Sequence, residues 1–115
     1  AGWAPRAQAV TTFSSHRVLD ARSLALHCLI AQKIMADPSL IDIARRNLAA
    51  GRRKSAGAEP HYLEEWQQIL ARPWPQVAGL ITEQSDNATR LRQSSPFAGI
   101  LSTVERRRIY DAFRA

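Results

Sequence analysis

Apolar side chains recur at helical spacing along most of this chain. Between residues 20 and 36 they occur at i, i+3, i+4 and i+8, which places them on one face of a helix that Asp20 can cap. No segment alternates apolar and polar residues with the period of two that is typical of a strand. The pattern therefore predicts helices throughout. The apolar residues of this first predicted helix are Leu26, Leu29, Ile30 and Ile34.

Capping residues mark the limits of a second helix. Asp37 supplies a capping carboxylate, and Pro38 follows in the first turn, where its missing N–H does no harm. Gly51 is well placed to end this helix. The segment 51–60 then contains three consecutive cations and two glycines without apolar periodicity, so we expect a loop there.

Prolines and a serine mark the next three helices. Pro60 begins a third helix, which the segment 72–75 (RPWP) ends. Pro75 then lies in the first turn of a short fourth helix. Ser85 precedes a fifth helix, which we expect to continue to Gln93.

The last helix has the clearest start signal. Ser102 and Glu105 match a capping box, in which each side chain satisfies one backbone N–H that the helix leaves unpaired. The whole pattern predicts an all-α fold, a single compact bundle of five to six short helices. Residues 1–15 contain no continuous hydrophobic block, and we expect them to form a flexible N-terminal arm ahead of a single helical domain at 16–115.

Length and cysteine content narrow the class of protein. A chain of 115 residues is long enough for one domain. Its single cysteine, Cys28, excludes an internal disulfide and fits a reducing cytoplasm. Charged residues interrupt every apolar stretch well short of the roughly 20 residues that a membrane helix needs. We expect a cytoplasmic protein that does not enter a membrane.

The charge distribution suits an acidic partner. The net charge is +6, and both ends of the chain are basic around a near-neutral middle. Such a charge favours nucleic acid or an acidic protein surface, because long-range attraction speeds association. The aromatic residues are not interleaved with the cations, as they are in a platform that stacks bases. The candidate nucleic-acid contacts are Arg45, Arg46, Arg52, Arg53 and Lys54.

The sequence shows no complete catalytic set. The adjacent residues His27 and Cys28 project about 100° apart on a helix, and no CxxC motif is present, so a zinc site is not predicted. Ser94 and Ser95 lack the GxSxG context of a nucleophile elbow. Neither GxxxxGK[ST] nor GxGxxG occurs. We therefore expect a protein that is not an enzyme and that has no cofactor or metal.

Two aromatic residues lie in turns. Trp74 stands between prolines, and Phe97 follows Pro96. Side chains in turns can project as anchors into the pocket of a partner. Alternatively, both rings close the ends of this chain's own helical core. The first interpretation predicts a protein that works in a complex.

Two segments of the chain resemble a known group of proteins. They are LALHCLIAQKIMADPSLIDIARRNLAA at 24–50 and LRQSSPFAGILSTVERRRIYDAF at 91–113. Both resemble small bacterial helical proteins with an "LH…DPxLL…AR.NL" start and an "LRQSSPFAGxLxxxER" end, associated with genes beside nucleotidyltransferase toxins. In particular, the chain is similar to the MenA-type antitoxins of the mycobacterial MenAT toxin–antitoxin systems. The second motif is the distinctive one.

This resemblance implies a protein partner. The partner is expected to be a toxin that transfers nucleotides onto tRNA 3′ ends. The antitoxin would neutralise it by covering its active site or by holding it in an inactive, phosphorylated state. The motif positions carried over are Arg92, Ser94, Ser95, Pro96, Phe97, Gly99, Leu101, Glu105 and Arg106. From the motif and the turns, the candidate partner-binding residues are Trp74, Arg90, Arg92, Ser94, Ser95, Pro96, Phe97 and Arg106. The alternative function is that of a small basic DNA- or RNA-binding regulator.

Overall fold

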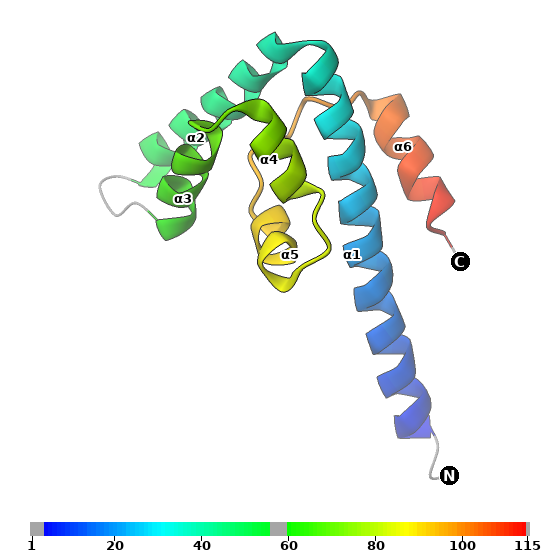
Figure 1. Cartoon of the computed structure of the whole chain (residues 1–115). Helices are drawn as coiled ribbons and strands as arrows, with labels where there is room; N and C mark the ends of the chain where they lie inside the picture. The colour runs from blue at the N-terminus through cyan, green and yellow to red at the C-terminus, as the bar shows by residue number, and fades with distance from the viewer. Residues whose placement is uncertain (1–3, 56–59, 115) are drawn as a thin grey trace.

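The structure is a helical bundle, which confirms the predicted all-α class. The computed structural model describes the backbone of residues 4–55 and 60–114, and side chains from His16 onward within these ranges. These residues form six α-helices and one short 3-10 helix and contain no strand (Figure 1). None of the helices in the described ranges is both long and apolar enough to cross a membrane. The elements are α1 (Ala4–Ala36), η1 (Pro38–Leu40), α2 (Ile41–Ser55), α3 (His61–Leu70), α4 (Trp74–Ile81), α5 (Asp86–Gln93) and α6 (Thr103–Ala112).

The long helix α1 organises the bundle. Its C-terminal half packs against α4, α5 and α6, whereas α2 and α3 pack on each other beyond the sharp turn at η1 (Figure 1). α6 follows one flank of α1 and is separated from the α2–α3 pair by the rest of the bundle. The helices α4 and α5 fill the space between α1 and α3.

The first helix begins earlier than the sequence pattern suggests. A start at Asp20 was expected, but α1 already begins at Ala4, with Pro5 in its first turn, where proline is tolerated. The segment 4–15 of the expected arm is therefore helical, while residues 1–3 lie outside the described residues. In Figure 1 this part of α1 extends away from all the other labelled helices, so it has the position of an arm.

The second helix ends later than expected. α2 continues through Gly51 to Ser55, so the prediction of a helix end at Gly51 is wrong. A Cβ atom at Gly51 would lie 3.0 Å from Cδ2 of Leu63, so glycine here allows α2 and α3 to approach closely. Arg52, Arg53 and Lys54 occupy the last turn of α2, where cations interact favourably with the helix dipole. Of the predicted loop 51–60, residues 56–59 lie outside the described residues.

The other predicted helix boundaries are confirmed. Asp37 caps the 3-10 turn η1 by accepting a hydrogen bond from the Ser39 backbone N–H. Pro60 precedes α3, and Pro75 lies in the first turn of α4. The Ser85 hydroxyl accepts a hydrogen bond from the Ala88 backbone N–H at the start of α5.

The hydrophobic core lies where α1, α2, α3 and α4 meet the loop that precedes α6. Trp66 is fully buried at its centre and is the largest side chain there. Within the described ranges, every helix except η1 and α6 contributes a buried side chain. The remaining core residues are Ile30, Ala31, Ile34, Ala44, Leu48, Leu63, Ile69, Leu70, Val77, Ile81, Leu91, Phe97, Ile100 and Leu101.

Polar contacts at its N-terminus hold α6 against α1. The predicted capping box is present: the Ser102 hydroxyl accepts from the Glu105 backbone N–H, and the Glu105 carboxylate accepts from the Ser102 backbone N–H. Lys33 Nζ of α1 donates to the same carboxylate and to the Ile100 carbonyl, both at 2.8 Å. The Lys33 ammonium and the backbone hydrogen bond from Ser102 lower the pKa of Glu105 to about 2.

The low pKa of Glu105 predicts a dependence of stability on pH. Because the folded-state pKa lies below its usual value, the ionised carboxylate stabilises the fold above pH 4.5, and this contribution is lost as the pH falls toward 2. Urea unfolding of the wild type and of Glu105→Gln should give midpoints that differ most at neutral pH and converge near pH 2. A difference that stays constant over this range would contradict the assigned cause.

Candidate functional site

The distinctive motif forms the irregular loop 94–102 between α5 and α6. Polar side chains of three helices hold this loop. His27 Nε2 of α1 lies 2.9 Å from Ser95 Oγ, and Trp66 Nε1 of α3 donates to Ser94 Oγ at 3.3 Å. Asn47 Nδ2 of α2 donates to the carbonyls of Pro96 (2.7 Å) and residue 98 (2.9 Å). The two serines and the proline expected at a partner surface therefore fix the loop within the bundle.

Phe97 lies in the core. Its side chain is 2% exposed, so the expectation that it projects from its turn as an anchor is wrong. The ring makes edge-to-face contacts with Trp66, His27 and Trp74, at centroid distances of 5.5, 6.0 and 6.2 Å. Gly99 has φ +94°, which lets the chain turn back toward Ile100 directly after the buried ring.

Trp74 is half-buried beside the same ring. Its indole N–H donates to the Ala31 carbonyl of α1 at 3.4 Å. The expectation that Trp74 projects freely from its turn is therefore also wrong. Both rings close this chain's own core, which is the alternative interpretation that the sequence left open.

The two arginines of α5 have different surroundings. Arg92 is 6% exposed and donates to the carbonyls of Ile81 (3.0 Å) and Glu83 (2.8 Å), so it satisfies the end of α4 and is not a surface contact. Arg90 is exposed and forms a two-bond pair with Glu65 of α3, both bonds at 2.9 Å. Arg106 is exposed on α6. Of the three predicted arginine contacts, Arg90 and Arg106 are thus at the surface.

His27 and Ser95 form a hydrogen-bonded pair that the sequence did not reveal. The Ser23 carbonyl, 2.7 Å from Nδ1, can only accept, so Nδ1 carries the proton and Nε2 accepts from the Ser95 hydroxyl. Burial lowers the pKa of His27, and the nearby charge of Arg92 acts in the same direction. The ring is therefore neutral, and its orientation depends on a backbone carbonyl. Among the described residues no group of three His, Cys, Asp or Glu side chains is arranged to hold a metal.

A small cavity lies between this pair and α6. Its volume is about 210 Å³. Leu26, Ile30 and Phe97 supply much of its apolar wall, while Arg106 and Tyr110 of α6 also line it. No carboxylate is among its lining residues.

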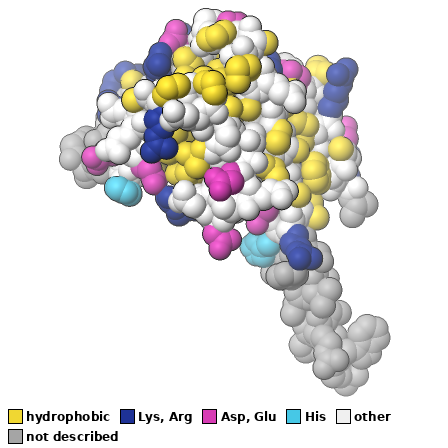
Figure 2. Space-filling model, viewed as in Figure 1, with side chains coloured by type: hydrophobic (Ala, Val, Ile, Leu, Met, Phe, Trp, Pro, Cys, Tyr) yellow, Lys and Arg dark blue, Asp and Glu magenta, His cyan; other side chains and the backbone are white. Residues whose placement is uncertain are grey.

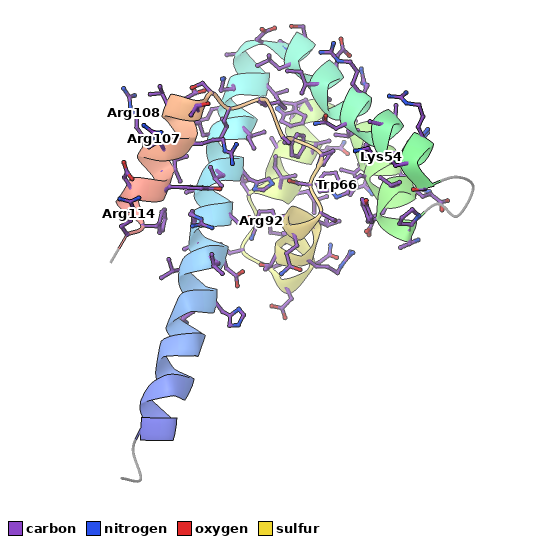
Figure 3. All side chains as sticks on the ribbon, turned by 180° about the vertical axis from the view of Figure 1, so that it is seen from behind. Lys54, Trp66, Arg92, Arg107, Arg108 and Arg114 are labelled. Carbon is purple, nitrogen blue, oxygen red and sulfur yellow. The ribbon has the colours of Figure 1, made fainter. Side chains whose placement is uncertain are left out.

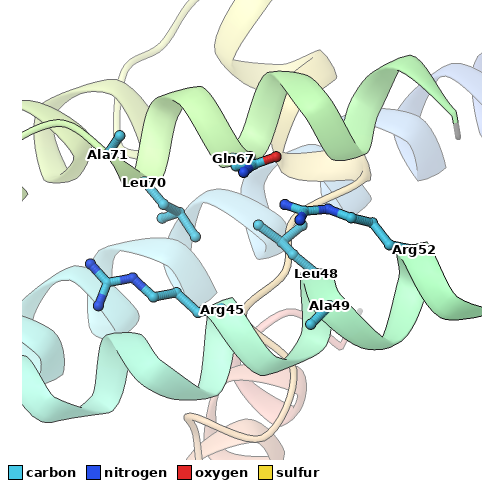
Figure 4. Close-up of a pocket in the computed structure, with 7 residues that line it drawn as sticks. All are labelled: Arg45, Leu48, Ala49, Arg52, Gln67, Leu70 and Ala71. Atoms are coloured by element: carbon cyan, nitrogen blue, oxygen red, sulfur yellow. The ribbon is translucent and has the colours of Figure 1, made fainter.

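The cations of α2 do not all line the same groove. Arg45 and Arg52 line a groove of about 410 Å³ between α2 and α3, opposite Gln67 and Leu70 (Figure 4). Arg46, Arg53 and Lys54 are exposed but do not line this groove. Two of the five predicted nucleic-acid contacts thus line the same groove.

An apolar patch lies on another face of the molecule. Hydrophobic side chains are exposed over α4 and the adjacent part of α1 (Figure 2). Met35 is 54% exposed there and lies near Ala31, Ala36 and Ala78.

The view from behind shows a buried aromatic residue and two exposed cations (Figure 3). Trp66 lies inside the bundle, whereas Arg107 and Arg108 lie on the outer side of α6.

Comparison of this chain with protein-family models, with curated proteins and with solved structures gives no match.

The burial of Phe97 predicts a loss of stability when its ring is removed. Phe97→Ala should lower the free energy of unfolding by about 3–5 kcal/mol, because it removes ring contacts and leaves a cavity. Phe97→Leu, which keeps most of the volume, should lower it by less. Urea unfolding followed by tryptophan fluorescence measures both values. A wild-type unfolding midpoint for Phe97→Ala would show that the ring does not hold the core together.

The buried neutral His27 predicts a second pH effect. Because folding lowers its pKa below 6.5, protonation favours the unfolded chain, and stability should fall as the pH drops below 6.5. In His27→Gln, whose amide can both donate and accept, the free energy of unfolding should change less between pH 7 and pH 5. An identical pH dependence in wild type and variant would assign the effect to other groups.

Proposed function

We propose that this chain is an antitoxin. It binds a cognate nucleotidyltransferase toxin that modifies tRNA, and it neutralises this toxin by direct protein–protein contact. The contact blocks the active site of the toxin or promotes its inactive, phosphorylated state. The resemblance of the segment 91–113 to the MenA-type antitoxins suggests the class of partner.

The observation that carries the proposal is the position of α1. Its N-terminal part extends beyond the bundle (Figure 1). A helix that packs against nothing is only marginally stable in water. Where α1 leaves the bundle, it carries the large apolar side chains Val18 (40% exposed) and Leu19 (46% exposed). A partner that covers this helix would both stabilise it and bury these two side chains.

The internal role of the motif is consistent with this proposal. Residues 92–102 join α5 to the end of α4 and hold the loop that precedes α6 against α1. The motif therefore acts as the scaffold of a binding surface, and the contacts with the partner come from the outer faces of α1 and α6. This division of roles between the motif and the outer faces of α1 and α6 explains why the motif contributes buried side chains such as Arg92 and Phe97.

A nucleic-acid regulator is less well supported. Only Arg45 and Arg52 share a groove, and neighbouring cations lie outside it. A protein that neutralises many phosphates has to bring its cations to one surface. The two proposed functions predict different losses of binding affinity as the salt concentration rises, so one binding experiment can distinguish them.

The proposal predicts that Val18 and Leu19 contribute to toxin binding. The purified cognate nucleotidyltransferase should bind the full chain, and Val18→Ser/Leu19→Ser should weaken this binding at least about tenfold. Tyr62→Ser is a matched control, because Tyr62 is similarly exposed at 43% but lies on α3. Affinity is measured by isothermal titration calorimetry, and neutralisation by nucleotide incorporation into tRNA.

The dependence of binding affinity on salt concentration can contradict the antitoxin proposal. The affinity for the toxin should fall far less between 50 and 200 mM salt than the roughly 1,000-fold or greater loss typical of many phosphate contacts. If the wild type does not bind the toxin but binds tRNA or DNA with such a steep salt dependence, the chain is a nucleic-acid-binding protein and not this antitoxin.

A further inference from the structure

Two arginines from different helices converge on one tyrosine. The Arg22 guanidinium of α1 lies 4.3 Å from the centroid of the Tyr110 ring, and that of Arg106 lies 5.8 Å from it. Arg106 and Tyr110 are one turn apart on α6. The ring attracts both cations, so it keeps them beside Tyr110 at the junction of α1 and α6.

These two positive charges have no carboxylate partner in the described part of the chain. The recorded ion pairs of the region involve Lys33 with Glu105 and Arg114 with Asp111. A hydrogen bond with Arg106 lowers the pKa of the Tyr110 phenol, and the charges of Arg106 and Arg22 lower it further. The positive charge that lowers this pKa also attracts an incoming anion.

The adjacent cavity limits what this anion can belong to. Its volume of about 210 Å³ is below the roughly 300–1,000 Å³ of pockets that enclose small-molecule ligands. A space of this size suits a single anchoring side chain of a protein. Leu26, Ile30 and Phe97 in its lining favour an apolar side chain, while Arg106 and Tyr110 add a cation and an aromatic ring to the same lining.

Helical geometry extends the site along α1. Val18 and Leu19 precede Arg22 by one turn, and Leu26 of the cavity follows it by one turn. Exposed apolar side chains, a cationic centre and an apolar cavity thus follow one another on the same side of the helix. We name this surface the α1–α6 face; it consists of Val18, Leu19, Arg22, Leu26, Arg106 and Tyr110.

We propose that the α1–α6 face binds an acidic segment of the toxin. A carboxylate of this segment lies between Arg22 and Arg106, and a neighbouring apolar side chain enters the cavity. This inference rests on the proposed antitoxin function and specifies where and by what chemistry the toxin is held. Charge complementarity requires an anion, and the small size and apolar lining of the cavity favour an acidic protein segment over a nucleotide or an RNA strand.

Charge reversal on two faces provides the test. Arg22→Glu/Arg106→Glu should weaken binding of the purified nucleotidyltransferase at least about 100-fold, because it replaces attraction by repulsion. The matched control, Arg46→Glu/Arg53→Glu, changes the net charge equally on exposed positions of α2 and should change affinity less than about threefold. Circular dichroism checks the fold. Should the reversal variant unfold, Arg22→Gln/Arg106→Gln removes both charges without adding repulsion and should still bind at least about tenfold more weakly than wild type.

Zero-length crosslinking identifies the group on the toxin. In the Arg106→Lys variant, carbodiimide should join the new amine to an Asp or Glu of the bound toxin, whereas Arg46→Lys should give no such crosslink. Mass spectrometry locates the acidic segment.

The outcomes separate this inference from the proposed function. Suppose that the wild type binds the toxin. If Arg22→Glu/Arg106→Glu binds as tightly as the wild type, or loses no more affinity than the control Arg46→Glu/Arg53→Glu, the α1–α6 face is not the docking site, although the antitoxin function stands. If the reversal abolishes binding of tRNA instead, the face binds nucleic acid and the inference is overturned. Failure of the wild type to bind the toxin overturns the proposed function and this inference together.

Discussion

The burial of Phe97 from an irregular loop is the constraint on which the rest of the structure depends. A loop that enters a core carries backbone N–H and carbonyl groups that would be costly to leave unpaired. Asn47 satisfies the carbonyls of Pro96 and residue 98, while Ser95 and the buried His27 satisfy each other. The ring then contacts three other aromatic rings. Because these partners come from α1, α2, α3 and α4, this one loop fixes the positions of four helices.

The same loop determines where α6 lies, and α6 is the least anchored helix of the bundle. Among its described residues none is buried, so it depends on Lys33, on its capping box and on the contact of Arg22 with Tyr110. Elements with few buried contacts open locally at lower free energy than the core does. A partner that binds across α1 and α6 would stabilise both the projecting part of α1 and this weakly held helix. Binding and local ordering are therefore expected to be coupled at this surface.

The distribution of arginines shows how residues of one type serve different purposes. Arg92 is buried and saturates carbonyls at the end of α4, whereas Arg90 forms an exposed pair with Glu65. Arg22 and Arg106 have no carboxylate partner within the described ranges and are held by Tyr110. This last arrangement places positive charge beside an apolar cavity. Net charge alone favours acidic partners of any class, whereas the proposed docking of an acidic protein segment rests on the position of the charge relative to apolar surface.

The sequence by itself determined the helical class and most helix boundaries, because caps and prolines act through local backbone geometry: Ser85, Ser102 and Pro60 lie where the pattern placed them. It misplaced the end of α2, since the reason for Gly51 is the approach of Leu63 and not a helix end. It also left open whether Phe97 and Trp74 face outward, because a turn has no periodicity that distinguishes inside from outside. Tertiary structure alone decided the pairing of His27 with Ser95 and the convergence of Arg22 and Arg106 on Tyr110. His27 and Ser95, like Arg22 and Tyr110, are far apart in the chain, so no local pattern in the sequence encodes their contacts.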